Sequence, residues 1–201
     1  MTSTAKPHAP SCDRNQQPIL DVLKGCFSDR KQVLEVGSGT GQHAVFFAAA
    51  MPWLTWQTAD MKESLPGIRL WLDEAALPNL PPPLELQAAG PWPKGPYDAV
   101  FSSNTLHIMG WPEVRKLFAA LDGVMAQDAV LAVYGPFNYG GKFTSASNAE
   151  FDVWLKRRSA ASGIRDFEAV NALAESIGLK LLADHAMPAN NRTLVWKRSA
   201  R

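Results

Sequence analysis

One short segment constrains this chain more than any other: the glycine-rich run 33–44, Val-Leu-Glu-Val-Gly-Ser-Gly-Thr-Gly-Gln-His-Ala. Its glycines stand at 37, 39 and 41, between an apolar stretch and a segment suited to a helix. Glycine is required where the backbone takes a positive φ or lies directly against a ligand. A dinucleotide-binding fingerprint has its third glycine one position later, where Gln42 stands. The run therefore predicts a strand, a tight turn and a helix, with a ligand at the turn.

Two acidic residues indicate which ligand suits this turn. Glu35 comes two residues before the first glycine, where a carboxylate would repel a pyrophosphate but favour a cationic amino group. Asp60 ends the next apolar segment, nineteen positions beyond Gly41, and can accept hydrogen bonds from both hydroxyls of a ribose. S-adenosylmethionine carries an amino group, a sulfonium and a ribose, so the pattern favours this cofactor. A tight turn without a ligand and a nicotinamide nucleotide site stay open as alternatives.

The order of elements predicts the fold class. Expected strands cover residues 31–36, 54–58, 84–88, 97–102, 129–134, 179–185 and 193–197. Expected helices cover 18–23, 42–51, 66–77, 112–125, 151–158 and 166–177, with a long loop at 135–147. We therefore expect one α/β domain over residues 1–201, with residues 1–15 as a mobile N-terminal arm. Its core is a Rossmann-like, doubly wound, seven-stranded sheet, mostly parallel with an antiparallel hairpin strand at the C-terminal edge.

Composition argues against several classes of protein. The chain has 20 basic and 19 acidic side chains, so nothing indicates nucleic-acid binding, and we interpret Lys156-Arg157-Arg158 as a solvated helix face. The longest apolar stretch, 44–54, is far too short to span a membrane and is interrupted by Pro52. Cys12 and Cys26 are too few for a disulfide framework, and no signal peptide is recognisable. We expect a cytoplasmic protein, and its oligomeric state is left open.

The sequence also resembles a known family over almost its whole length. The resemblance rests on Arg14-Asn15, Pro18-Ile19-Leu20, the glycine run with Gln42-His43, Pro91-Trp92-Pro93, 103–108 (Ser-Asn-Thr-Leu-His-Ile), 135–141 (Gly-Pro-Phe-Asn-Tyr-Gly-Gly), Ser147-Asn148, Phe151-Asp152, 163–166 (Gly-Ile-Arg-Asp) and 187–191 (Met-Pro-Ala-Asn-Asn). These strings are similar to those of the methyltransferase-like family called domain of unknown function 938. The resemblance implies a class I methyltransferase fold and an S-adenosylmethionine site, and it leaves the methyl acceptor open.

The predicted cofactor site follows the carboxyl ends of the strands, where ligands bind in such sheets. By analogy with the fold, the adenine would meet Gln87 and Ala88; relatives resemble Leu-Asp-Val there, whereas this chain has Leu86-Gln87-Ala88. Arg14 would pair with the cofactor carboxylate. The full predicted set is Arg14, Asn15, Glu35, Gly37, Ser38, Gly39, Thr40, Gly41, His43, Asp60, Met61, Gln87, Ala88, Ser103 and Asn104.

Candidate chemistry lies beyond the fourth predicted strand. His107 could act as a base at the transferred methyl group, or pack under the following helix. Asn104 could hold the acceptor or the methionyl end of the cofactor. A glycine-hinged lid over a small acceptor is predicted to include Phe137, Asn138, Tyr139, Lys142, Phe143 and Arg165. Asp166 is interpreted as a helix cap, and no residue spacing suggests a metal site.

These features predict an S-adenosylmethionine-dependent methyltransferase that acts on a small molecule. A catalytically silent protein that binds the same cofactor, as a sensor or partner subunit, is the main alternative. A nicotinamide-dependent oxidoreductase is a third, which Glu35 and the missing glycine at position 42 oppose.

Overall fold

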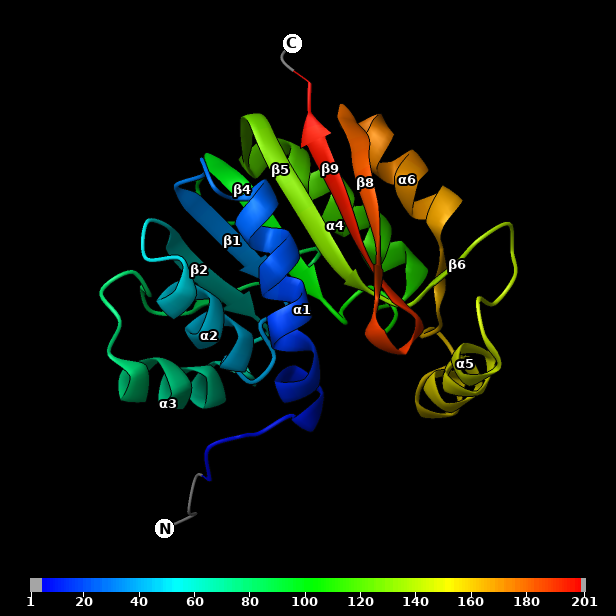
Figure 1. The fold of residues 1–201 in the computed structure, drawn as a ribbon, viewed down its shortest axis with the longest axis horizontal. Coiled ribbons are helices and arrows are strands. Elements are labelled where there is room, and N and C mark those ends of the chain that lie inside the picture. Colours follow the sequence, from blue (N-terminus) through cyan, green and yellow to red (C-terminus); the bar gives the residue numbers. More distant parts are fainter. Residues whose placement is uncertain (1–4, 200–201) are drawn as a thin grey trace.

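A computed structural model describes residues 5–199 as a sheet covered by helices on both faces (Figure 1). The strands of the main sheet are β1 (Gln32–Val36), β2 (Thr55–Asp60), β3 (Leu84–Glu85), β4 (Tyr97–Ser103), β5 (Met125–Gly135), β8 (Leu179–Met187) and β9 (Asn191–Arg198). The helices are α1 (Pro10–Cys26), α2 (Gln42–Ala50), α3 (Leu65–Ala75), α4 (Trp111–Val124), α5 (Ala146–Arg158), α6 (Phe167–Ser176) and the short 3-10 turn Pro188–Asn190. None of these helices is long and apolar enough to cross a membrane.

The sheet confirms the predicted class. Its strand order is β3-β2-β1-β4-β5-β9-β8, and β9 runs antiparallel to both of its neighbours. The reversed strand is therefore the penultimate one, and β8 forms the edge. The chain builds outward from β1 to β3 and then returns to place β4 on the other side of β1. This change of direction opens a crevice beyond the carboxyl ends of β1 and β4, which is where such sheets bind ligands.

Two hydrophobic clusters, one on each face of the sheet, hold the layers together. One packs α1 and α2 against the sheet through residues such as Leu23, Phe47 and Trp56. The other packs α4 and α6 against the opposite face, through Phe118, Val170 and neighbouring aliphatic side chains. Figure 1 shows α1, α2 and α3 in front of the sheet, with α4 and α6 behind it. Because both faces are covered, the middle residues of β4 and β5 are buried and mainly apolar.

The first helix begins much earlier than predicted. α1 starts at Pro10, so residues 10–15 of the predicted mobile arm are helical, and Pro18 lies inside the helix rather than in its first turn. Local signals mark Pro18 as a helix start, but burial of Ile19, Leu20 and Leu23 and the contacts of the preceding turn favour a longer helix. Residues 5–9 contact α3, where Lys6 pairs with Glu74. Residues 1–4 of the predicted arm lie outside the described part of the chain.

The segment predicted as one long loop at 135–147 contains structure of its own. β6 (Phe137–Asn138) pairs in parallel with β7 (Arg165–Asp166), and α5 begins at Ala146, five residues before the predicted start. The Ser145 hydroxyl caps this helix by accepting from the Asn148 N–H at 3.1 Å. The third strand is shorter than predicted, so Gln87 and Ala88 follow β3 rather than belonging to it.

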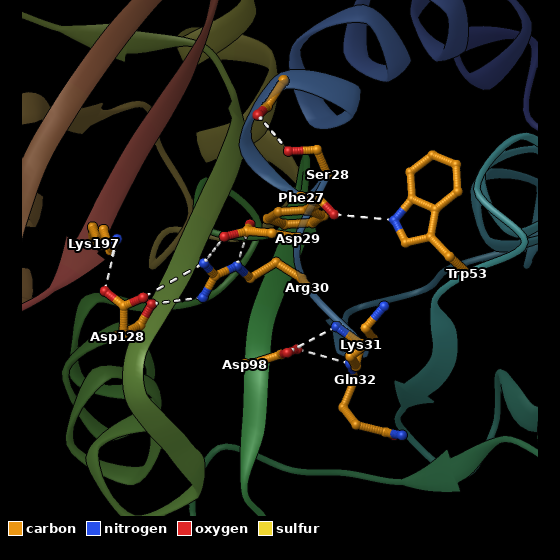
Figure 2. A network of polar contacts seen from close by, with 11 residues as sticks. Phe27, Ser28, Asp29, Arg30, Lys31, Gln32, Trp53, Asp98, Asp128 and Lys197 are labelled. Atoms are coloured by element: carbon orange, nitrogen blue, oxygen red, sulfur yellow. Dashed lines mark hydrogen bonds and ion pairs between the residues drawn. The ribbon is translucent and has the colours of Figure 1, made fainter.

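Polar contacts fix the amino ends of the central strands, opposite the crevice (Figure 2). The Asp98 carboxylate at the start of β4 accepts from the Lys31 and Gln32 N–H groups, both at 2.7 Å. Arg30 donates to the Asp128 carbonyl oxygen of β5 at 2.9 Å and pairs with Asp29. These contacts set the relative positions of β1, β4 and β5 without using any group at their carboxyl ends.

We expect Arg198→Ala to lower the free energy of unfolding by about 3 kcal/mol, measured by urea denaturation. The Arg198 side chain is 5% exposed and donates to the carbonyl oxygens of Met125 at 2.7 Å and Ile177 at 3.2 Å, which would lose their partner. Arg157→Ala, the same substitution on an exposed helix face, should change stability by less than about 0.5 kcal/mol. Equal effects of the two substitutions would contradict this account.

Candidate functional site

A cavity of about 830 Å³ lies beyond the carboxyl ends of β1, β2 and β4 and beside the chain that follows β3. This volume falls within the range of roughly 300–1,000 Å³ that is usual for small-molecule sites. Eleven of the fifteen predicted cofactor residues line it: Gly37, Ser38, Gly39, Thr40, His43, Asp60, Met61, Gln87, Ala88, Ser103 and Asn104. Glu35, Gly41, Arg14 and Asn15 do not. Four separate segments of sequence therefore converge on one cavity, as their positions at strand ends predict.

The glycine run forms one wall, and two of its glycines show why other residues would not fit. Gly37 and Gly41 have φ of +77° and +91°. A Cβ at Gly37 would lie 2.4 Å from Thr105 Oγ1, and one at Gly41 would lie 3.2 Å from Ile68 Cα. Gly39, with φ of +59°, differs because a Cβ there would meet no atom within 4 Å. Its missing side chain keeps open space beside the cavity, which is the predicted role of a glycine against a ligand.

Asp60 joins the end of β2 to this loop. Its Oδ2 accepts from the Gly39 N–H and its Oδ1 from the Met61 N–H, both at 2.7 Å. Each carboxylate oxygen has a second lone pair, so both can still accept from a ligand. Asp60 therefore shapes the glycine turn and also presents acceptors on the cavity wall.

Glu35 lies in a different position from the one its sequence pattern suggests. Its side chain is 1% exposed and is not on the cavity wall, and Oε2 accepts from Trp56 Nε1 at 3.0 Å. Burial raises the pKa of this carboxyl to about 7, although hydrogen bonds from Trp56 and Ser38 act in the opposite direction. The carboxyl group of Glu35 lies in the protein interior, which disfavours the predicted direct contact with a ligand amino group. That contact stays a prediction.

A buried chain of hydrogen bonds connects α1 to the cavity. His43 Nε2 lies 2.7 Å from Asn15 Oδ1, and His43 Nδ1 lies 3.1 Å from the hydroxyl of Ser103. The His43 ring is stacked on Phe47 and is 4% exposed. Burial lowers the pKa of His43 to about 4, so the ring is neutral at pH 7. Asn15 thus reaches the site through other side chains and does not line it.

The N-terminal turn of α1 contributes a wall that the sequence analysis missed. Ala9, Ser11 and Cys12 line the cavity because α1 begins at Pro10. Gln42 anchors this turn, since its Oε1 accepts from the Ala9 N–H at 2.6 Å. The Gln42 residue that separates the glycine run from a dinucleotide fingerprint therefore ties α1 to α2. Arg14 is exposed on α1, close enough to Tyr134 for its charge to lower the pKa of that hydroxyl against the larger, opposite effect of burial.

A second group of missed wall residues is mainly apolar and lies toward α4. Its members are Leu86, Trp92, Ile108, Met109 and Leu117, with Glu113 and Lys116 also on the wall. Apolar and aromatic side chains of this kind suit a flat heteroaromatic ring. The string Pro91-Trp92-Pro93 was the available signal for Trp92, but nothing in its pattern indicates which way the indole faces.

His107 lies behind the wall rather than on it. Its side chain is 5% exposed, and its ring meets Phe151 edge to face at a centroid distance of 5.4 Å. A Cβ built on Gly135 would lie 3.5 Å from Nδ1 and 3.9 Å from Asn104 Oδ1, so all three residues are neighbours. Burial, with a smaller effect of the Arg165 charge, lowers the pKa of His107 to about 4. Within residues 5–199, neither ring nitrogen has a hydrogen-bond partner.

The predicted lid residues do not converge on the cavity. Phe137 and Asn138 are buried in the β6 strand, and the Tyr139 hydroxyl donates to Asp184 at 2.7 Å. Arg165 donates to the carbonyl oxygens of Leu106, Met109 and Ala161 and so supports the chain that follows β4. Lys142 and Phe143 are exposed. Most of the polar and aromatic side chains that were predicted to contact the acceptor instead pack within the protein or hydrogen-bond to other parts of it.

Asp166 stands at the N-cap position of α6 as predicted, but the expected capping hydrogen bond of its side chain is not formed. Its Oδ1 is buried without a partner in the described structure. Asp166 also pairs with Asn138 in the parallel β6–β7 ladder.

Comparison with known families gives one match to this chain. The family described as "Protein of unknown function (DUF938)" matches residues 6–198. This range includes every predicted site residue.

Several solved structures that share this fold are named as methyltransferases. An O-methyltransferase family protein from Burkholderia thailandensis is 18% identical with a TM-score of 0.78, covering 94% of this chain and 58% of its own. Mitomycin 7-O-methyltransferase is 19% identical with a TM-score of 0.79, covering 92% and 54%. Human N-acetylserotonin methyltransferase, solved in complex with S-adenosylmethionine, is 13% identical with a TM-score of 0.74, covering 94% and 53%. The chain spans little more than half the length of these proteins.

We expect the buried Glu35 carboxyl to make stability depend on pH. Its pKa is 4.5 in the unfolded chain and about 7 in the folded one, so stability falls as pH rises between these values. The loss is about 3 kcal/mol, at ~1.4 kcal/mol for each pH unit. Glu35→Gln should remove it in urea unfolding at pH 4.5 to 7.5, whereas Glu85→Gln, at an exposed site, should follow the wild type. Parallel curves for wild type and Glu35→Gln would contradict the assignment.

Proposed function

Since the chain belongs to the DUF938 family and shares its fold with O-methyltransferases, we propose that it is an S-adenosylmethionine-dependent methyltransferase acting on a small molecule. One observation carries the proposal. The glycine turn, Asp60, the Gln87–Ala88 segment and the end of β4 all line a single cavity at the point where the strand order changes direction.

The hydrogen-bonding and apolar groups on the cavity wall fit this cofactor. Asp60 presents two acceptors for ribose hydroxyls, and Gly39 leaves open space for a ligand that lies against the backbone. Leu86, Trp92 and Leu117 would enclose the adenine, and Gln87 can accept from its amino group. When bound, S-adenosylmethionine would supply its sulfonium methyl group to the acceptor and leave as S-adenosylhomocysteine.

His107 is the proposed base that takes a proton from the acceptor. Its imidazole is neutral at pH 7 and its two nitrogens have no partner among the described residues, whereas both nitrogens of His43 are engaged. Asn104 lines the cavity, and Gly135 lies beside both Asn104 and His107. An acceptor bound between Asn104 and His107 would therefore lie between the cofactor cavity and the proposed base. Phe151 beside His107 offers an aromatic surface for the acceptor. The neighbours' O-methyltransferase names favour an oxygen atom as the acceptor.

We expect S-adenosylhomocysteine to bind the purified protein in titration calorimetry, and Gly39→Val to abolish binding because a side chain there would occupy ligand space. Gly178→Val is the matched control: Gly178 also has a positive φ, +81°, and open surroundings, but lies at the end of α6, away from the cavity. It should suffer a similar conformational cost and keep its affinity. Equal affinities of both variants would place the ligand elsewhere.

We expect His107→Gln to lower methyl transfer at least 100-fold, with S-adenosylhomocysteine affinity unchanged because His107 is not on the wall. A screen of phenols, thiols, amines and acids, scored by release of S-adenosylhomocysteine, supplies the acceptor. His185→Gln, an exposed histidine on β8, is the control. Full activity of His107→Gln would show that His107 is not the base. If no acceptor in the screen yields S-adenosylhomocysteine, the alternative of a catalytically silent cofactor-binding protein is favoured.

A further inference from the structure

The hydrogen bonds around His43 have only one consistent direction. The oxygen of Asn15 faces His43 Nε2 at 2.7 Å and can only accept, so Nε2 of the neutral ring carries the proton. The amide nitrogen of Asn15 is then left to hydrogen-bond the Tyr134 hydroxyl, a contact that lowers the hydroxyl pKa against the larger effect of burial. Asn15 is buried, so water does not compete for either end of the amide.

This direction determines how Ser103 faces the cavity. With its proton on Nε2, His43 presents a lone pair at Nδ1, and the Ser103 hydroxyl donates its single proton to it at 3.1 Å. Ser103 and His43 both line the cavity, but the His43 side chain is only 4% exposed and its Nδ1 is engaged by the Ser103 hydroxyl. The hydroxyl oxygen of Ser103 can therefore accept a hydrogen bond from a ligand, and it cannot donate one.

We propose that His43 and Asn15 act through Ser103 as positioning residues, which make its hydroxyl oxygen an obligate acceptor for the cationic amino group of the bound cofactor. The inference rests on the proposed function, and it assigns the recognition of the amino-acid end of the ligand to the end of β4. Neither His43 nor Asn15 needs to touch the ligand in this role.

Two features of the site support an amino group at this place. Glu35, the acidic residue that the sequence pattern assigns to the amino group, is buried away from the wall. Asp60 lies on β2, separated from the β4 end by β1, and faces the predicted ribose position. Ser103 thus supplies an oxygen acceptor at the strand end where the methionyl part of the ligand is predicted. An ammonium group donates and never accepts, which matches an oxygen that can only accept.

The test compares two ligands by titration calorimetry: S-adenosylhomocysteine and its deaminated analogue, in which hydrogen replaces the amino group. We expect Ser103→Ala to weaken S-adenosylhomocysteine binding about 10- to 100-fold, since hydrogen bonds to charged groups are among the stronger ones. Binding of the analogue should change less than about threefold. Ser102→Ala, the same substitution one position earlier, removes a hydroxyl that donates to the Val36 carbonyl oxygen and is not on the wall, and it should preserve the discrimination.

A second variant tests whether His43 acts through Ser103. His43→Phe keeps an aromatic ring stacked on Phe47 but removes the acceptor, so the Ser103 hydroxyl becomes free to donate toward the ligand. Because the freed hydroxyl oxygen keeps its lone pairs, discrimination between the two ligands should fall by less than in Ser103→Ala, and the double variant should lose no more than Ser103→Ala alone. Near-ultraviolet circular dichroism establishes that each variant is folded.

Equal losses for both ligands in Ser103→Ala, or additive losses in the double variant, would overturn the inference while S-adenosylhomocysteine still binds the wild type. Failure of the wild type to bind S-adenosylhomocysteine at all would remove the proposed function and this inference together.

Discussion

The hydrogen bond from the Gly39 N–H to Asp60 Oδ2 joins the ends of two neighbouring parallel strands, and the site depends on it. The parallel register of β1 and β2 brings the glycine turn and Asp60 to the same edge of the sheet. At that edge, the Asp60 carboxylate accepts a hydrogen bond from the Gly39 N–H, which has no backbone partner within the turn. The same contact leaves lone pairs of Asp60 on the cavity wall, so one interaction shapes the turn and supplies ligand acceptors.

The interior around the cavity uses neutral groups whose hydrogen bonds have a direction. His43 and His107 are both uncharged at pH 7 because burial disfavours the imidazolium form. The Glu35 carboxyl holds its proton more tightly for the same reason. The neutral hydrogen-bond chain Asn15–His43–Ser103 avoids the free-energy cost of burying a charge. Because its hydrogen bonds have a fixed direction, it can still favour a ligand group that donates over one that accepts. The charged side chains of the site, such as Asp60 and Lys116, lie on the cavity wall and not in this buried layer.

Local patterns predicted the parts of the molecule that depend on local chemistry. Alternating apolar runs and turn residues identified the sheet, and the spacing of Gly37, Gly39, Gly41 and Asp60 located the cavity wall. The failures lie where distant contacts decide. Helix α1 begins early because its first turn is tied to Gln42, and Asp166 pairs with β6 while its expected capping hydrogen bond is not formed. Sequence placed Glu35 at the correct strand end, but only the packed structure shows that its side chain lies among core residues.

A crystal structure of the protein grown with S-adenosylhomocysteine would decide whether this cavity is the cofactor site. We expect ligand density in the cavity between Gly39 and Ser103, with ribose hydroxyls on the Asp60 carboxylate and the adenine beside Trp92. Density at any other place, or an Asp60 carboxylate turned away from the ligand, would contradict this expectation.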